Sequence, residues 1–508
     1  EVHVASSRIG FARMGWFAGA AALVVAFSGP FTDRHGAPAV AAALNPFCGT
    51  VTPLSLAPAM PPAVKLHPGS GDQAFVDCIA WQEFIYLNWR AKPGSIGQPD
   101  RSARPNAFGR PVTSRSAIEQ TVWESYHSAD ELFAPPALRA VKARRGRLLL
   151  AATDKFQGHA ISINGTQEAT GGWLTSRTGQ LTFYEIRVDN DEYDYITDPN
   201  NNLTSISAQL ACAKSKFGLQ LPHGKFSIGT APPESDVDCR GNPRWYGDQI
   251  GAMELKAAWL PLPNDPAVWS KYLITVADVL YPGTKTPKRD VVVGLVGLHI
   301  IHKVPGAEQL LWATFEHIDN APDSSQAAGP APAVSGTPGP WTYYNPQSTA
   351  PPNVQPGPPC PTPGCQPYSV PVQVLRIAAI PAQAVAATAA FNALLANNPS
   401  VFRNYELVNV QWPSASVRVK PGARRPLPDG GSVPALRSTV PPQVANATLE
   451  TYFQNHSCLY CHSGATIATP QIELVGGRPL IEIVNEKRRK PGWYSSDYSF
   501  LFSNATRP

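Results

Sequence analysis

The segment from residue 147 to residue 320 places the strongest constraint on the fold. It consists of short runs of β-branched and aromatic residues with Gly, Pro, Asn and Asp between them, which is typical of β-strands joined by turns. The runs do not alternate with long helical patterns, so a doubly wound parallel sheet is disfavoured. We expect a β-rich antiparallel body here, a sandwich or barrel-like sheet. The runs are LLLAATD, LTFYEIRV, MELKAAWLPL, KYLITVADVLY, DVVVGLVGLHIIHK and LLWATFEHI.

Helical patterns flank this body on both sides. Residues 72–89 carry apolar side chains at helical spacing without Gly or Pro, which predicts a buried helix in an N-terminal helical region over 44–146. A second helix is expected within 118–133. Residues 369–440 form a mixed region, with an Ala-rich helix over 382–397 and the strand NYELVNVQW. The predicted fold class is therefore α+β, with a helical region at each end.

Proline divides the chain further. Many of its 53 Pro residues lie between 321 and 368, in stretches such as GPAPAVSGTPGP. Such a composition has little apolar surface to bury against the entropy cost of ordering. We expect 321–368 to be an extended Pro-rich insert or linker on the surface.

The first 43 residues have the order of a secretory signal peptide. Arg8 and Arg13 precede an apolar stretch over 16–27, and small residues follow at 39–43. The apolar stretch is too short to span a bilayer, so we expect no membrane span in the mature chain. The alternative is a buried N-terminal helix. A signal peptide predicts export, to the periplasm of a bacterial cell envelope.

Export changes the interpretation of the eight cysteines. Setting two aside, the remaining six suggest three disulfide bonds, because an oxidising compartment favours them. Fifteen pairings of six cysteines exist, and free buried thiols are the alternative. The simplest pairing joins sequence neighbours: Cys48 with Cys78, Cys212 with Cys239, and Cys360 with Cys365.

The weak net charge and the absence of two common motifs disfavour several functions. The net charge of +5 is spread over 508 residues, and no long basic run occurs beyond 487–490, so nothing indicates nucleic-acid binding. The sequence contains no phosphate-binding P-loop and no G-x-S-x-G nucleophile motif.

One motif carries specific chemistry. Residues 458–462 read Cys-Leu-Tyr-Cys-His, the C-x-x-C-H pattern. Two thiols at this spacing lie on one helical turn and can add to the two vinyl groups of a haem, while the adjacent His reaches the iron. A redox dithiol, a surface disulfide or half of a zinc site are the alternatives. A helix over 448–455 is expected directly before the motif.

With this motif, residues 445–508 resemble the c-type cytochromes. The resemblance implies a haem-binding region over 441–508 that holds one covalent haem c and its iron. Cys458 and Cys461 would form the thioether bonds, and His462 would be the proximal iron ligand. Residues before 440 resemble no family that we can name.

The second axial ligand is harder to place. Small c-type cytochromes usually supply it from a Met or His downstream of the motif, and none occurs between His462 and residue 508. We therefore expect an upstream ligand, with His299, His317 and Met253 as candidates, or a water-bound or open site. On a strand, His299 should share a face with Val293, Leu295 and Ile301. His302 should point to the opposite side and be exposed.

Two classes of function follow from the motif. The first is single-electron transfer by a periplasmic monohaem cytochrome to a redox partner protein. The second is a haem enzyme of the peroxidase or oxygenase type, or one acting on a small nitrogen substrate, with an open distal iron site. A third reading is an exported binding protein whose haem region is a redox appendage.

Overall fold

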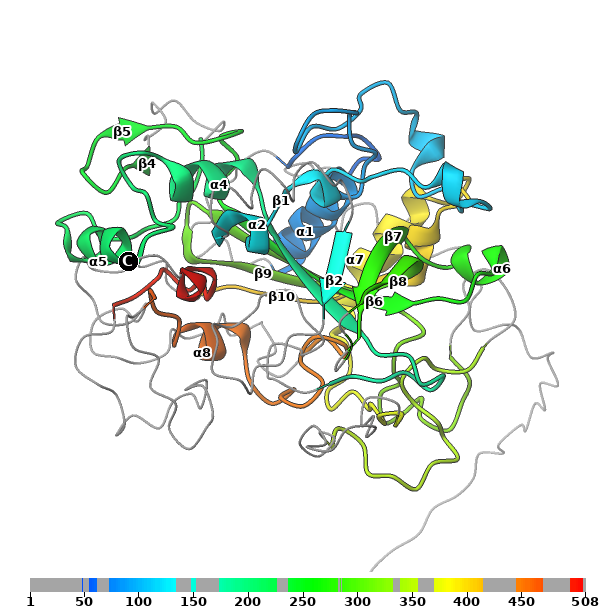
Figure 1. Cartoon of the computed structure of the whole chain (residues 1–508). Helices are drawn as coiled ribbons and strands as arrows, with labels where there is room; N and C mark the ends of the chain where they lie inside the picture. Colours follow the sequence, from blue (N-terminus) through cyan, green and yellow to red (C-terminus); the bar gives the residue numbers. More distant parts are fainter. Residues whose placement is uncertain are drawn as a thin grey trace, which may run out of the picture.

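The computed structural model describes most of the chain outside the N-terminus (Figure 1). The described residues are 48, 54–61, 73–133, 148–151, 173–225, 236–281, 284, 286–331, 339–354, 370–413, 445–468 and 494–505. The predicted signal peptide over 1–43 lies outside them. Within these ranges, no helix combines the length and the apolar composition needed to cross a bilayer.

The core of the structure is a mostly antiparallel sheet of eight strands. All six strand runs predicted between 147 and 320 form strands, as does the run after 404. The strands are β1 His127–Ser128, β2 Leu148–Ala151, β3 Phe183–Val188, β6 Met253–Pro261, β7 Ile274–Leu280, β8 Lys288–Val304, β9 Ala307–His317 and β10 Tyr405–Gln411. A separate two-stranded sheet pairs β4 Asp236–Val237 with β5 Pro243–Arg244.

The long strand β8 lies at the centre of the sheet. It pairs with β6 along one edge, and with β7 and then β9 along the other. β3 and β1 extend the sheet beyond β6, β10 extends it beyond β9, and β2 joins β7 in the one parallel pairing of the sheet. The sheet is not closed into a barrel, and helices and coil cover its faces in the described residues. The antiparallel prediction is confirmed, and the barrel-like alternative is wrong.

A β-bulge in β8 changes which residues share a face. Ala258 of β6 pairs with Gly297, but the next residue, Trp259, pairs with Leu295. The extra residue in β8 turns Val293 and Leu295 to the face opposite His299. The expected grouping of His299 with these two residues is therefore wrong, because it assumed unbroken alternation.

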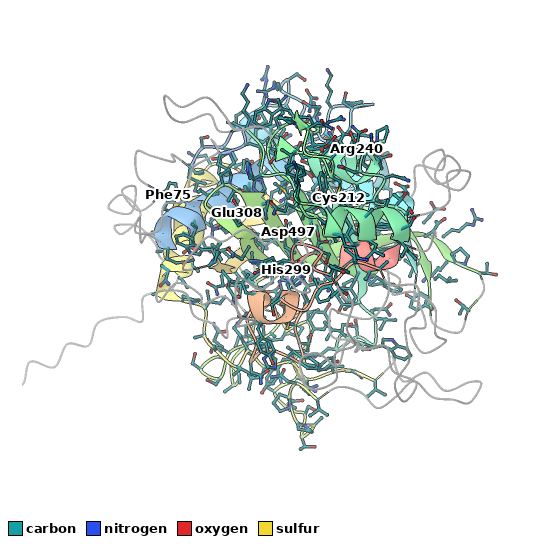
Figure 2. All side chains as sticks on the ribbon, turned by 90° about the vertical axis from the view of Figure 1, so that its left-hand side faces the viewer. Phe75, Cys212, Arg240, His299, Glu308 and Asp497 are labelled. Carbon is teal, nitrogen blue, oxygen red and sulfur yellow. A yellow bond between two sulfur atoms is a disulfide. The ribbon has the colours of Figure 1, made fainter. Side chains whose placement is uncertain are left out.

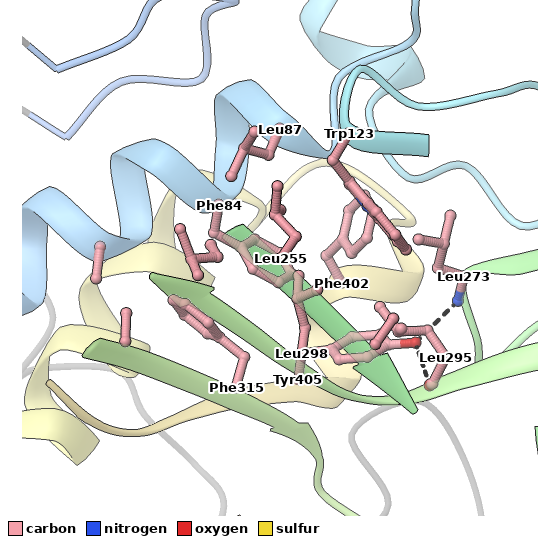
Figure 3. Packing of buried hydrophobic residues seen from close by; sticks show 14 of the residues in the cluster. Phe84, Leu87, Trp123, Leu255, Leu273, Leu295, Leu298, Phe315, Phe402 and Tyr405 are labelled. Atoms are coloured by element: carbon pink, nitrogen blue, oxygen red, sulfur yellow. Dashed lines mark hydrogen bonds between the residues drawn. The ribbon is translucent and has the colours of Figure 1, made fainter. Parts of the chain in front are cut away.

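Two helices cover the first face of the sheet (Figure 3). They are α1 Gln73–Leu87 and α7 Ala382–Leu394, both close to their predicted positions. Trp81 of α1 stacks on Phe391 of α7, with ring centroids 3.9 Å apart, and meets Phe315 of β9 edge-on at 4.9 Å. These aromatic residues belong to the largest apolar cluster among the residues that the structure describes.

The C-terminal part of the chain covers the second face (Figure 1). The centre of this face carries polar side chains, which bond to residues 445–468 instead of packing against a helix. The Asn446 amide donates to Thr314 Oγ1 and to the Phe315 carbonyl, and the Ala447 N–H donates to Glu316 Oε2 at 2.8 Å. Tyr184 Oη donates to the Thr448 carbonyl at 2.9 Å.

These contacts explain why the expected helix over 448–455 is absent. The segment consists of turns. The Thr448 carbonyl, which a helix would pair with the N–H four residues on, accepts from Tyr184 Oη, and the Ala447 carbonyl accepts from the Thr451 hydroxyl. The prediction of a helix there is wrong. The helix expected within 118–133 shrinks to α2 Ala129–Phe133 after a 3-10 turn at Trp123–Ser125.

Several short elements fall in segments where no helix was predicted. Between the strands lie α4 Asn190–Thr197, α5 Ile206–Lys214 and α6 Pro266–Trp269, and the motif itself forms α8 Cys458–His462. Within the described ranges, further 3-10 turns are Pro105–Ala107, Arg115–Ala117, Val401–Asn404 and Leu501–Asn504.

Two of the expected disulfide bonds are present. Cys48 bonds to Cys78 and Cys212 bonds to Cys239, as the neighbour pairing predicted. The pair Cys360 and Cys365 lies outside the described residues.

The Pro-rich segment is only partly a surface feature. Its described residues form no helix or named strand, as expected. Nevertheless Trp341 is 2% exposed and Tyr343 is fully buried, with the Tyr343 hydroxyl 2.8 Å from Thr182 Oγ1. The aromatic residues therefore attach this segment to the body of the protein.

A substitution at Gly297 tests the contact between the sheet and the C-terminal segment. A Cβ at this position would collide with Thr448 Oγ1 and approach the Asn446 side chain. We expect Gly297→Ala to lower the free energy of unfolding by about 1–3 kcal/mol in urea titrations. In a Thr448→Ala background the same change should cost clearly less, because the colliding oxygen is gone. Gly339→Ala is the control, since its nearest neighbour is 3.8 Å away; equal costs in both backgrounds would contradict this packing.

Candidate functional site

The C-x-x-C-H residues form a single helical turn against the second face of the sheet. The Ser457 hydroxyl caps α8 by accepting from the Tyr460 N–H, and the Cys458 N–H donates to Gln411 Oε1 of β10 at 2.8 Å. Leu459 is buried in an apolar cluster with Ile301 and Trp312 of the sheet. The motif is therefore fixed to the central strands.

The orientation of His462 is set by a backbone carbonyl. Its Nδ1 lies 2.8 Å from the Tyr498 carbonyl oxygen. Because a carbonyl only accepts, Nδ1 carries the hydrogen, and Nε2 of the neutral ring keeps its lone pair. Trp312 and Phe500 pack on the imidazole, with ring centroids 4.3 and 5.0 Å away. Burial lowers the pKa of His462 to about 4, so the ring is neutral at neutral pH.

The two motif cysteines are not bonded to each other. Burial raises the pKa of the Cys458 thiol well above its usual range, and the pKa of Cys461 to about 11. The negative charge of Glu450 adds to both increases. Both groups are therefore neutral thiols at neutral pH.

Beside the motif, the sheet presents a hydrogen-bonded acid–base pair. His299 lies in a cross-strand row with Lys256 and Thr314, on the face that α8 covers. Its Nε2 is 2.6 Å from Glu450 Oε1. Burial alone would raise the pKa of Glu450, but the interactions with His299 and with Lys256 lower it overall. Figure 2 labels the His299 side chain, which is buried.

The other two candidates for a second axial ligand lie on the opposite face. His317 is three residues beyond Thr314 on β9, so it points away from α8. Its Nε2 donates to the Lys271 carbonyl and its Nδ1 accepts from the Asp319 N–H, so both ring nitrogens are occupied. Met253 has no exposed surface and packs in the core beneath α1. Of the three candidates, only His299 shares a face with the motif.

His302 points away from His299, as predicted, but it is not exposed. It is 4% exposed beneath α1, where Nδ1 lies 2.6 Å from Glu83 Oε1 and Nε2 donates to the Ile250 carbonyl. The expectation of an exposed side chain is wrong, because α1 supplies a buried carboxylate partner on that face.

A pair of buried carboxyl groups lies next to the site. Glu254 lies close to Glu192 and to Ser499, the residue after Tyr498. Burial raises the pKa of Glu254 to about 7 and that of Glu192 well above its usual value. A negative charge on Glu254 raises the pKa of Glu192 further, so simultaneous ionisation of the two groups is disfavoured.

Sequence reasoning missed several residues of this site. Trp312, Tyr498, Glu450 and the two glutamates come from distant parts of the chain, and no local pattern marks them. In the part of the chain that the structure describes, no three His, Cys, Asp or Glu side chains gather in a way that could hold a metal ion. Comparisons with family models, curated proteins and solved structures find no match for the chain.

The carboxyl pair predicts a pH dependence of stability. The folded-state pKa of Glu254 is above its unfolded value, so the native state binds the extra proton between these values. The contribution of protonated Glu254 to the free energy of unfolding is complete below about pH 4.5 and is lost as the pH rises through about 7. In urea unfolding of Glu254→Gln, the change in the free energy of unfolding across this pH range should be smaller than in the parent by about 3 kcal/mol, because the amide mimics the protonated acid. Glu119→Gln, at an exposed site, should leave the slope unchanged; a Glu254→Gln slope equal to that of the parent would contradict the raised pKa of Glu254.

Proposed function

We propose that this chain is an exported, monohaem c-type cytochrome that transfers single electrons. Cys458 and Cys461 attach the haem through thioether bonds, and His462 is the proximal iron ligand. The observation that carries the proposal is the hydrogen bond from His462 Nδ1 to the Tyr498 carbonyl. It leaves Nε2 as the free ligand atom, and metal-binding histidines are commonly oriented in this way.

The chemistry of the donor groups fits a haem. A haem brings four nitrogen ligands of its own, so one neutral imidazole is enough to attach the iron to the protein. Each thiol adds across a vinyl double bond, exchanging S–H for S–C and C–H bonds, and no oxidant is consumed. Redox-active dithiols instead need a lowered thiol pKa, and both thiols here have a raised one. This difference disfavours a thioredoxin-like role.

The surrounding residues would hold the ligand in place during electron transfer. When bound, the haem iron would accept or release the transferred electron and so change its charge by one. Trp312 and Phe500 restrict rotation of the His462 ring, and the sheet excludes water from its buried side. A rigid, dry ligand environment lowers the reorganisation that accompanies a change of charge. The reaction partner is then a periplasmic redox protein.

The proposed compartment has independent support. The disulfide bonds Cys48–Cys78 and Cys212–Cys239 fit an oxidising environment. The order of residues 1–43, with a basic part, a short apolar part and small residues, also fits export.

One observation favours a second candidate, a haem enzyme with an open distal site. His299 Nε2 is already bonded to Glu450, and such a pair can deliver or accept a proton beside a reacting ligand. For electron transfer, His299 would have to exchange this bond for the iron or bind through Nδ1. The two candidates therefore assign different roles to the same imidazole.

Attachment of haem is tested by replacing the motif residues. After expression with a c-type maturation system, the Cys458→Ala/Cys461→Ala variant should carry no covalent haem, because no thioether can form. Haem staining of denatured protein measures this. His456→Ala is the matched control, since His456 lies close to the motif but stacks on Tyr460 instead of facing Trp312. Parent protein without covalent haem would end the proposal.

The response to carbon monoxide separates the two candidates. If His299 holds the iron, the absorption spectrum of the reduced protein should be unchanged by carbon monoxide. The spectrum of His299→Leu should shift, because leucine could not bind the iron and carbon monoxide could. His456→Leu should behave like the parent. A parent spectrum that shifts with carbon monoxide would favour the enzyme, and His299→Leu or Glu450→Gln should then slow turnover of peroxide without changing the spectrum.

A further inference from the structure

The carbonyl that orients His462 belongs to an unusual turn. Asp497 and Tyr498 both have positive φ angles, of 56° and 71°. Residues with a Cβ rarely adopt this left-handed conformation, and each such residue costs about 1 kcal/mol or more. Two consecutive examples persist only when the surroundings hold them.

A buried ion pair holds the turn from the side of the sheet. Asp497 Oδ2 lies 2.9 Å from Nζ of Lys303 at the end of β8, and it also accepts from the Leu221 N–H at 2.8 Å. The two side chains are 1% and 2% exposed. Lys303 is itself fixed, because Nζ donates to the Glu308 carbonyl at 2.5 Å. Figure 2 labels Asp497 and Glu308 in this part of the molecule.

Further bonds connect the turn to the helix that carries His462. The Ile467 N–H donates to the Tyr494 carbonyl at 3.0 Å, and Thr466 and Ser495 form an antiparallel bridge. Ser495 Oγ in turn accepts from the Asp497 N–H. The turn is thus joined to the chain just after α8 on one side and to β8 on the other.

We propose that Asp497 is a positioning residue whose ion pair with Lys303 fixes the Tyr498 carbonyl against Nδ1 of His462. The inference rests on the proposed function in one respect, since it takes the group bound by Nε2 of His462 to be haem iron. A fixed acceptor at Nδ1 makes the imidazole a stronger donor at Nε2, which favours oxidised over reduced iron. Loosening the turn should therefore raise the reduction potential.

The test removes both charges together. In Lys303→Met/Asp497→Leu the net charge of the pair is unchanged, and apolar replacement of a buried ion pair is often tolerated. We expect covalent haem to be retained and the reduction potential to shift upward. The matched control is Lys271→Met/Asp319→Leu, a second Lys–Asp pair that does not contact the turn; its potential should not change.

A direct electrostatic effect of the Asp497 and Lys303 charges on the iron would give a different pattern of reduction potentials. If the charges act directly on the iron, Asp497→Asn raises the potential, Lys303→Met lowers it, and the double variant matches the parent. That pattern would overturn the positioning role. If the double variant does not fold, Asp497→Asn, which keeps the shape of the side chain, is examined by the second measurement below.

The second measurement needs no haem. In the haem-free chain labelled with ¹⁵N-histidine, NMR reports the His462 Nδ1–H signal and its exchange with water. We expect exchange in the double variant, and in Asp497→Asn, to be roughly two- to tenfold faster than in the parent, as loss of one hydrogen bond implies. An unchanged signal would contradict the inference. A parent chain that never acquires haem would refute the proposed function alone, because this signal remains readable.

Discussion

The fold depends on the burial of β8 on both of its faces. Apart from its first three residues, the whole of this 17-residue strand is buried. Side chains of a strand alternate between the two faces, so both need a cover. The helices α1 and α7 supply the apolar cover on one side, and the C-terminal segment supplies a hydrogen-bonded cover on the other. The C-x-x-C-H turn is consequently part of the wall of the core and not an appendage to it.

The sequence predicted the elements that local patterns determine. The strands between 147 and 320, the helices α1 and α7 and the two observed disulfide bonds follow from side-chain periodicity and from cysteine order. The helix predicted before the motif does not form because the Thr448 carbonyl accepts from Tyr184 of β3, a contact between residues 264 positions apart. The bulge in β8 was equally invisible, since it is defined by pairing with β6.

The residues of the candidate site could likewise be predicted only where their pattern is local. Cys458, Cys461 and His462 stand out because their spacing is local. Whether His299 or His317 faces them depends on the register between β8 and β9, which no local pattern encodes. The register places His299 beside the motif and His317 behind the sheet. Tyr498 could not have been predicted, because its role resides in a carbonyl group and a positive φ angle rather than in its side chain.

Covalent attachment of haem to this turn can be measured by mass spectrometry of the chain after maturation, followed by digestion and sequencing of the modified peptide. We predict a mass increase of one haem, located on the peptide that contains Cys458 and Cys461. An unmodified peptide, or one in which these cysteines are joined to each other, would contradict it.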